Sequence, residues 1–457
     1  MREVKAHHRR GLQGAPLMNL DHRTLYRLPW NASDNVLSWL EPTNKCNLSC
    51  DGCYRENDGT HKSLAEVQAD LDVFRKWRTY DSVSIAGGDP LLHPEIVEII
   101  RLVVADGHKP IINTNGVALT RALLEDMKRA GLVGLTFHVD SHQGRPGAWR
   151  GKNELELNSL RLEYARLVAS VGGLSCAFNA TVYEDTLHHV PALVQFAADH
   201  IDLINSVIFI MYRAATTEGE FEYFRNGQAV EATPLVYAVD QLKQRSDITA
   251  PEMVALIQRR FPDFAPSAYL GGTEKPDSFK WLFTGRFGFP KNGTDSKVLG
   301  YVGPRFMELV QNAHHFVKGT YLAYAPKWTL EAGRSAMAMG IVEPGMRGIA
   351  RAWAAHLARH PLDVRKKVHF QSVMMIQPID VLADGRQNMC DGCPDVTAHD
   401  GQIVWSCRLE EYRKYGGLVS CAPKAQACAS AKGCSTAASC AHVGERPAAP
   451  ARADVVA

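Results

Sequence analysis

Three cysteines lie within eight residues near the start of the chain, in the stretch CNLSCDGC. They are Cys46, Cys50 and Cys53. Iron–sulfur clusters are normally held by four thiolates, so a loop of three could bind three irons of a cubane and leave the fourth open. A structural zinc site needs four ligands and would have to borrow a distant histidine or cysteine. The spacing therefore favours an iron–sulfur cluster with one open iron.

A second group of cysteines lies near the C-terminus. Cys390 and Cys393 form a CxxC pair, and Cys407 and Cys421 follow at moderate distances. This pattern is a metal signal that suits either zinc or an iron–sulfur cluster. We predict one auxiliary [4Fe–4S] cluster on these four residues, and structural zinc is the alternative.

The remaining cysteines carry a weaker signal. Cys176 reads as a small buried residue of a strand, whereas Cys428, Cys434 and Cys440 lie in an Ala/Ser-rich stretch and read as surface thiols. The chain has 11 cysteines, an odd number, gathered mainly in two groups of a long chain. A secreted disulfide framework is usually short with cysteines throughout, so metal binding is the better interpretation.

Further polar motifs lie where short β-type runs end. GGDP spans Gly87, Gly88, Asp89 and Pro90, whereas Asn115 lies in NTNG, Asp140 lies in HVDSH and Asn179 lies inside a strand-like run. In parallel α/β folds, ligands collect at the carboxyl ends of the strands. We therefore expect these motifs and the first cysteines to meet at one site.

The elements that must position this site alternate regularly from about residue 36 to 212. Strands that alternate with crossover helices form a parallel sheet, and near-continuous apolar strands suggest a barrel. We predict an α/β fold, a partial (β/α)6 TIM-type barrel. The expected strands cover residues 36–43, 82–88, 109–116, 132–140, 174–183 and 203–212, and the expected helices cover 63–79, 94–107, 119–130, 153–172 and 187–199.

The alternation stops after Tyr212. We expect an N-terminal extension over residues 1–35, the barrel over 36–212 and a mostly helical substrate or covering region over 213–365. One more buried strand, within 366–378, would open a cysteine-rich extension for the auxiliary cluster that runs to residue 442. Residues 443–457, rich in Ala and Pro, are expected to be disordered.

The first motif resembles a known family. CNLSCDGC matches the CxxxCxxC pattern of the radical S-adenosylmethionine (SAM) superfamily, and GGDP is similar to its GGEP motif. The resemblance implies a partial (β/α)6 barrel in which Cys46, Cys50 and Cys53 hold a [4Fe–4S] cluster. SAM would chelate the open iron through its amino and carboxylate groups.

The resemblance also implies the SAM contacts. The carbonyls of the GGDP residues would accept from the SAM amino group, and Asn179 would contact its ribose or carboxylate. Asn115 and Asp140 are expected in the same pocket, where Asp140 and its two histidine neighbours could touch SAM or substrate, or cap the strand end. No catalytic residue is assigned.

Two positions depart from the family pattern. The residue before the third cysteine is often aromatic in the family and packs near SAM, but here it is Gly52, and Tyr54 follows the cysteine instead. Asp89 replaces the commoner glutamate with a shorter carboxylate of the same charge. These departures affect the expected details of the SAM pocket rather than cluster binding.

The implied reaction is a reductive cleavage of SAM to a 5′-deoxyadenosyl radical, which abstracts hydrogen from an unactivated substrate carbon. The C-terminal cysteines resemble SPASM and twitch extensions in position and density. An auxiliary cluster would favour oxidation or C–C or C–S bond formation. The alternatives are a modifier of a peptide or lipid-like substrate with zinc in the extension, and a non-catalytic iron–sulfur module.

Composition limits the partners. The 457-residue chain has a net charge of +2, which points to no nucleic-acid partner. No apolar run reaches the ~18 residues that a membrane span requires, and the basic N-terminus lacks the apolar stretch of a secretory signal. We expect a cytoplasmic protein that receives single electrons from a reductant such as flavodoxin or ferredoxin, and whose substrate is unknown.

Overall fold

The computed structural model describes residues 20–292 and 295–424. The three cysteines read as surface thiols, Cys428, Cys434 and Cys440, lie outside the described residues, as does the tail predicted for 443–457. None of the helices in the described ranges is long and apolar enough to cross a membrane.

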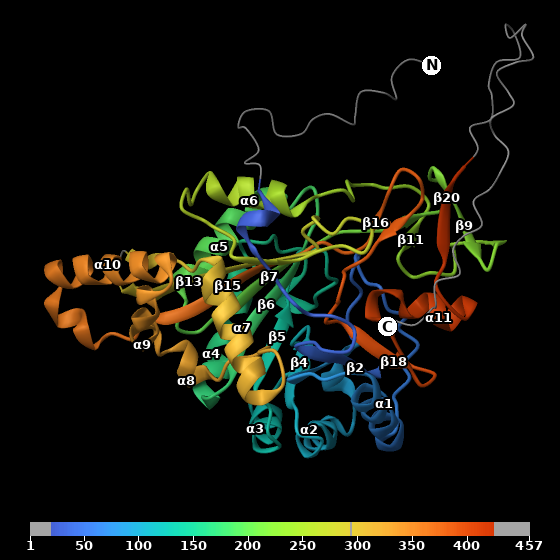
Figure 1. The fold of residues 1–457 in the computed structure, drawn as a ribbon. Coiled ribbons are helices and arrows are strands. Elements are labelled where there is room, and N and C mark those ends of the chain that lie inside the picture. Colours follow the sequence, from blue (N-terminus) through green and yellow to red (C-terminus); the bar gives the residue numbers. More distant parts are fainter. Residues whose placement is uncertain (1–19, 293–294, 425–457) are drawn as a thin grey trace, which may run out of the picture.

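Six parallel strands form the centre of the molecule, and they confirm the predicted α/β fold (Figure 1). Each strand pairs with the next along the chain, as short right-handed crossovers require. Most residues of these strands are buried, which is typical of a parallel sheet covered on both faces. The strands are β2 (Leu37–Thr43), β3 (Ser82–Gly87), β4 (Lys109–Thr114), β5 (Gly134–His138), β6 (Ser175–Val182) and β7 (Ser206–Met211).

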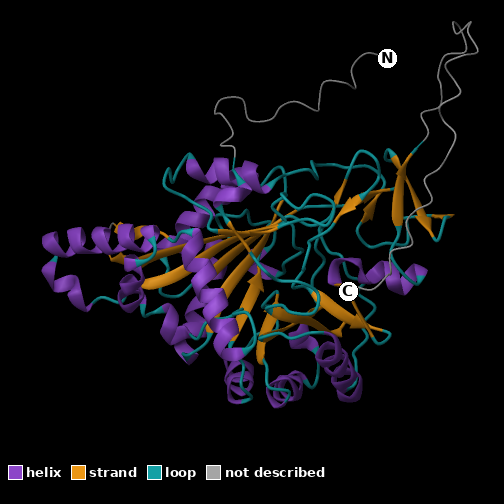
Figure 2. Ribbon diagram, in the orientation of Figure 1, coloured by secondary structure: helices purple, strands orange, loops and turns teal. Residues whose placement is uncertain are grey.

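The crossover helices cover the outer face of this sheet (Figure 2). Their starts follow from local chemistry: Ser63 and Glu66 form a reciprocal capping box, and the Thr120 hydroxyl accepts from the Leu123 N–H. Each helix buries an apolar stripe against the strands. The helices are α1 (Leu64–Trp77), α2 (Ile96–Ala105), α3 (Arg121–Arg129), α4 (Asn158–Val171) and α5 (Val190–Asp199).

The middle region is less helical than the sequence suggested. The predicted helical character holds from Pro304 onward, but seven strands precede it. In the longest, WLFTGRFGFPKN, glycines and a proline interrupt the apolar alternation and hide the strand pattern. The strands are β8 (Ala215–Thr216), β9 (Phe221–Arg225), β10 (Gln228–Val230), β11 (Ala238–Val239), β12 (Ala268–Leu270), β13 (Trp281–Asn292) and β14 (Asp295–Tyr301).

The helices of the middle region follow, apart from α6, which lies between β11 and β12. Helix α10, the last of them, packs with β13 and β14 and forms a second core. In this core Met346, Ile349 and Trp353 pack with Phe287 and Phe289. The helices are α6 (Ala250–Gln258), α7 (Pro304–Lys318), α8 (Lys327–Leu330), α9 (Gly333–Ala336) and α10 (Pro344–Arg359).

The additional buried strand predicted within 366–378 is confirmed as β15 (His369–Ile376). It lies parallel beside β7 and antiparallel beside β13, so it joins the barrel strands to the middle region. The sheet then continues through β12 to β1 (Tyr26–Arg27), which gives the order β1-β12-β13-β15-β7-β6-β5-β4-β3-β2.

The C-terminal extension covers the other edge of the sheet. Its hairpin packs against β2 and α1, which protects the edge strand β2 from solvent (Figure 1). Its last strand pairs with β9, so the extension also contacts the middle region. Its elements are β16 (Asp380–Val381), β17 (Gln387–Asn388), β18 (Val396–His399), β19 (Gln402–Trp405), α11 (Leu409–Tyr415) and β20 (Ser420–Pro423).

Candidate functional site

The first cysteine loop follows β2 at the carboxyl end of the sheet. Cys46, Cys50 and Cys53 are half-buried free thiols that line a large cavity. The Asn57 side chain fixes the loop, because its Oδ1 accepts from the Cys46 N–H (3.1 Å) and its Nδ2 donates to the Cys46 carbonyl (3.0 Å). A turn with a hydrogen bond from the Cys53 N–H to the Cys50 carbonyl brings the last two thiols together.

The environment of these thiols favours a bound iron–sulfur cluster. Burial raises the pKa of Cys50 to about 12 and also raises the pKa of Cys46. Thiolates at these positions therefore need a positive charge beside them, which a bound iron–sulfur cluster supplies.

The GGDP motif supports the cysteine loop directly. The Gly88 N–H donates to the Thr43 carbonyl (2.8 Å), and the Asp89 N–H donates to the Lys45 carbonyl (2.7 Å). A Cβ on Gly87 would lie 2.4 Å from the Thr43 oxygen, and one on Gly88 would lie 2.3 Å from the Lys45 oxygen. Both glycines line the cavity, but their small size is first required by the neighbouring backbone.

Asp89 and Pro90 are buried and do not line the cavity. The Asp89 carboxylate accepts from the Thr114 hydroxyl (2.8 Å) and from the N–H groups of Asn115 (2.9 Å) and Leu91 (3.0 Å). Burial raises the pKa of Asp89, and these donors partly offset that cost. The carboxylate thus joins the end of β3 to the loop after β4.

Asn115 contacts the cysteine loop from that neighbouring loop. Its Nδ2 donates to Asn47 Oδ1 (2.7 Å) and lies 3.7 Å from Cys46 Sγ. Its Oδ1 accepts from the Val117 N–H (2.8 Å), which fixes the amide orientation. Asn115 lines the cavity next to the first cysteine.

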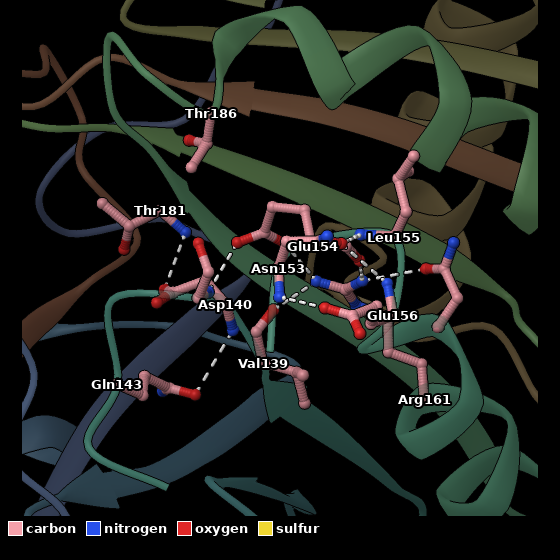
Figure 3. A network of polar contacts seen from close by, with 12 residues as sticks. Val139, Asp140, Gln143, Asn153, Glu154, Leu155, Glu156, Arg161, Thr181 and Thr186 are labelled. Atoms are coloured by element: carbon pink, nitrogen blue, oxygen red, sulfur yellow. Dashed lines mark hydrogen bonds and ion pairs between the residues drawn. The ribbon is translucent and has the colours of Figure 1, made fainter. Parts of the chain in front are cut away.

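Asp140 organises the end of β5 (Figure 3). Its carboxylate accepts from the N–H groups of Thr181 (3.2 Å) and His142 (3.0 Å), and it lies 2.8 Å from His138 Nε2. Burial alone would raise its pKa, but the hydrogen bond from His138 and these N–H groups lower it below the usual value. Asp140 does not line the cavity, whereas His138 does.

Asn179 on β6 lies beside His138 in the sheet register. It lines the cavity, and its buried Oδ1 has no hydrogen-bond partner among the described residues. Asn113 on β4 lines the same cavity, and its buried Nδ2 is likewise without a partner in that part of the chain. Unpaired buried polar atoms are costly, so this pair indicates a polar ligand such as SAM.

The loop after β5 also holds the cysteine loop, which the sequence did not reveal. The Gly144 N–H donates to the Ser49 carbonyl (2.7 Å), and the Asp51 N–H donates to the His142 carbonyl (3.1 Å). The buried Arg145 donates to the carbonyls of His138 (2.7 Å) and Asn115 (3.0 Å). A single arginine in a loop gives no signal of such a role; its place at a strand end is the only clue.

The C-terminal cysteines line the same cavity as the first three. Cys390 and Cys393 are buried, and a hydrogen bond from Cys393 lowers the pKa of Cys390 while raising that of Cys393. Cys407 interacts electrostatically with both of them, and burial raises its pKa to about 12. Three of the four predicted ligands, Cys390, Cys393 and Cys407, thus interact electrostatically with one another.

Cys421 lies on β20, where its Sγ accepts from Gln387 Nε2 (3.0 Å). Burial raises its pKa. Among the described residues, no group of three or more His, Cys, Asp or Glu side chains could hold a single metal ion.

One buried contact links the first cysteine loop to the C-terminal cysteines. Arg55, two residues after Cys53, forms an ion pair with Glu41 of β2 and donates to the Ser406 hydroxyl (3.1 Å) and carbonyl. Ser406 directly precedes Cys407. The C-terminal cysteines are also held at the end of α1, where buried Arg78 donates to the Cys393 carbonyl (3.2 Å). Burial lowers the pKa of Arg78 to about 10.

The cavity between the cysteine sets has a volume of about 1910 Å³. Its wall includes Arg213 and Asp395. Arg213 is paired with Asp380 (3.0 Å), which also accepts from buried Lys280 (2.7 Å). The Asp395 carboxylate has no hydrogen bond or ion pair within the described residues, and burial raises its pKa to about 7.

Comparison with known proteins agrees with this geometry. The family model described as "Radical SAM superfamily" matches residues 40–189. The chain is 25% identical over 195 residues to 7,8-dihydro-6-hydroxymethylpterin dimethyltransferase of Methanocaldococcus jannaschii, covering 40% of this chain and 37% of that protein. It is 29% identical over 171 residues to GTP 3′,8-cyclase 1 of Mycobacterium tuberculosis, covering 35% and 46%. The chain thus spans less than half the length of these curated relatives.

Solved structures of two similar proteins were also found. Methylornithine synthase (PylB) has a TM-score of 0.34 and 13% identity, covering 50% of this chain and 63% of that chain. Native anSMEcpe with bound AdoMet and Cp18Cys peptide has a TM-score of 0.35 and 15% identity, covering 50% and 59%.

The family match falls on the predicted barrel and includes the first cysteines, the GGDP motif and Asn179. The cofactors of this family are a [4Fe–4S] cluster and SAM. The residues described above fit both, since three thiols share a cavity with two unpaired amide groups. Residues 40–189 of the chain are therefore similar to the radical SAM domain.

Proposed function

We propose that the chain is a radical SAM enzyme with a second cluster in its C-terminal extension. Cys46, Cys50 and Cys53 hold the [4Fe–4S] cluster that binds SAM, and Cys390, Cys393, Cys407 and Cys421 hold an auxiliary [4Fe–4S] cluster. The observation that carries this proposal is that both cysteine sets line the same cavity. A substrate between them would contact both sites.

When bound, the cluster and SAM supply a 5′-deoxyadenosyl radical that removes hydrogen from an unactivated substrate carbon. The residues of the chain bind and orient. Gly87 and Gly88 hold the cysteine loop, and Asn115 supports it at Cys46. Asn179 and Asn113 present an acceptor and a donor to SAM, and Asp140 fixes His138 at the cavity wall.

A cavity that excludes water once substrate is bound would protect a reactive intermediate. Residues of the middle region line it from above the strand ends, including Leu235, Tyr237 and Leu242. The extension closes the β2 side through Arg55 and Ser406. These segments are far apart in sequence, so the shape of the cavity depends on their packing against one another.

Oxidation or C–C or C–S bond formation is the proposed reaction class. Oxidation of a substrate radical releases one electron, and the C-terminal cysteines would place an acceptor at the cavity wall. The same cluster could instead anchor the substrate. The first electron for SAM cleavage would come from a reductant such as flavodoxin or ferredoxin.

The cavity volume favours a second candidate substrate class. Pockets for small ligands usually have volumes of about 300–1,000 Å³, whereas this cavity has a volume of about 1910 Å³. Space beyond SAM could accept a segment of a peptide or a lipid-like molecule. In this variant of the proposal the extension would hold structural zinc.

The eight free cysteines of the described residues support a reducing, cytoplasmic setting.

The test is the metal content of anaerobically reconstituted protein, together with its electron paramagnetic resonance (EPR) spectrum. We expect about eight irons in the wild type and about four after Cys46, Cys50 and Cys53 are replaced by Ala. The SAM-responsive signal should disappear in that variant. Cys176→Ala, a buried cysteine outside both sets, is the matched control and should keep all the iron.

The other outcomes separate the alternatives. About four irons falling to none, with zinc in both proteins, would support the zinc variant. Wild type that binds SAM but forms no 5′-deoxyadenosine under reducing conditions would indicate a non-catalytic module. Wild type without any iron would contradict the proposal.

A further inference from the structure

Gly52 and the Tyr183 hydroxyl lie next to each other in space although the two residues are far apart in sequence. Gly52 lies in the cysteine loop, and Tyr183 directly follows β6. A Cβ built on Gly52 would lie 2.8 Å from the Tyr183 hydroxyl oxygen, 3.5 Å from Thr181 Cγ2 and 3.6 Å from Tyr183 Cζ. The tyrosine hydroxyl therefore fills the space that any side chain at position 52 would take.

Two neighbouring aromatic rings restrict the orientation of the Tyr183 ring. It stacks on His142 with ring centres 3.9 Å apart, and Tyr212 lies 4.9 Å away at a tilted angle. His142 is itself held by Asp51 of the cysteine loop (2.8 Å) and by Asp185 (3.2 Å). These contacts hold the ring in place, and the hydroxyl end of Tyr183 lies against Gly52 of the cysteine loop.

The hydroxyl end lies at the cysteine loop. Tyr183 is 2% exposed, and it lines the cavity together with Gly52, Cys50 and Cys53. Its hydroxyl has no hydrogen-bond partner among the described residues. Burial and the nearby carboxylates raise the pKa of Tyr183, so the hydroxyl keeps its proton and can donate.

We propose that the Tyr183 hydroxyl donates a hydrogen bond to bound SAM, and that Gly52 is needed because a side chain there would displace this hydroxyl. The inference rests on the proposed function, since it requires SAM at the first cysteines. A donor at the wall of the cavity that has no partner among the described residues is available to an acceptor on a bound ligand. SAM offers carboxylate, hydroxyl and ring-nitrogen acceptors beside the cysteine loop.

The first test is the SAM dissociation constant of reconstituted protein, measured by anaerobic equilibrium dialysis, with iron content and the EPR shift on SAM addition. Tyr183→Phe removes the hydroxyl alone, and we expect about tenfold weaker SAM binding with unchanged iron. Tyr80→Phe is the matched control. Tyr80 also lines the cavity, is 2% exposed and stacks on a histidine at 3.9 Å, but it precedes β3 at the amino end of the sheet, away from the cysteine loop.

The second test is a double substitution that separates contact from packing. Gly52→Ala should disturb the loop, because the new methyl group meets the Tyr183 hydroxyl at 2.8 Å. Adding Tyr183→Phe relieves this clash, because the next atoms lie at 3.5 Å or beyond. We expect the double variant to recover the iron content but to bind SAM as weakly as Tyr183→Phe alone.

Three results would overturn the inference. Tyr183→Phe could bind SAM as tightly as wild type, Tyr80→Phe could lose as much affinity as Tyr183→Phe, or the double variant could regain wild-type affinity. The last result would show that Tyr183 only fills the space at Gly52. Failure of the proposed function is distinguishable, because wild type itself would then bind no SAM.

Discussion

At the scale of single residues, the site depends on a few backbone and amide groups around the first cysteine loop. The glycines of GGDP and Gly52 are there because neighbouring atoms leave no room for a side chain. Asp89 and Asp140 satisfy N–H groups of the adjoining loops, so their charge serves the scaffold. The unpaired amide atoms of Asn113 and Asn179 are among the groups of the described residues that a ligand could satisfy.

Gly88→Ala should abolish binding of the first cluster. Its Cβ would lie 2.3 Å from the Lys45 carbonyl oxygen, and a backbone atom cannot move away as a flexible side chain can. We expect the iron content of reconstituted protein to fall by about half, to the level of the auxiliary cluster. Gly348→Ala is the control, because nothing lies within 4 Å of its Cβ. Full iron content in Gly88→Ala would refute the packing argument.

Asn179→Ala should weaken SAM binding without weakening the protein. The change removes an unpaired buried acceptor, so the unfolding temperature of the cluster-free chain should not fall. SAM affinity, measured by dialysis, should fall about tenfold. Thr397→Val also removes an unpaired buried oxygen, but Thr397 does not line the cavity, so its SAM affinity should be unchanged. Equal affinities in both variants would contradict the assignment.

At the scale of elements, β15 joins the barrel to the middle region. His369 opens this strand, is 6% exposed and has an Nδ1 without a partner among the described residues. Burial lowers its pKa below the ordinary value of 6.5. In the unfolded chain the imidazole titrates near that ordinary value, so the unfolded state binds more protons in the interval just below it.

His369 should therefore make stability fall as the pH drops below about 6.5. We expect the unfolding temperature of the cluster-free chain to be lower at about pH 5.5 than at about pH 7.5, and His369→Gln to reduce this difference. The exposed His360, changed to Gln, is the control and should leave the difference as in wild type. An identical pH dependence in wild type and His369→Gln would rule out this contribution.

At the scale of the whole molecule, distant segments of the chain are joined around one cavity. The extension packs on β2 and α1, and the buried Arg55–Glu41 pair connects the first cysteine loop to Ser406. Removing one partner of a buried ion pair leaves an uncompensated charge, whereas removing both can be nearly neutral. Substitutions of this pair therefore measure how much the contact with the extension contributes to the stability of the fold.

Arg55→Met should reduce the free energy of unfolding by about 3–5 kcal/mol. The double variant Glu41→Met/Arg55→Met should lose less, since it leaves no buried carboxylate without a partner. Urea denaturation followed by circular dichroism measures both. Arg101→Met removes an exposed ion pair with Glu98 and should cost less than about 1 kcal/mol. A double variant less stable than Arg55→Met would contradict the account.

Much of the barrel could be predicted from the sequence. The six strands and five crossover helices alternate with clear periodicity, and the structure places each within a few residues of its expected range. The strands of the middle region could not be predicted in this way. In β13, glycines and a proline break the apolar pattern, and its pairing with β15 joins residues about 85 positions apart, as with Arg286 and Gln371.

The sequence by itself determined the chemistry of the first site, because three thiols at fixed spacing lie on one short loop whatever the rest of the chain does. Only the tertiary structure decided which residues surround that loop. Gly144, Tyr183 and Ser406 reach it from three separate segments. Contacts between residues far apart in sequence leave no local pattern, so the folded chain alone brings both cysteine sets to one cavity.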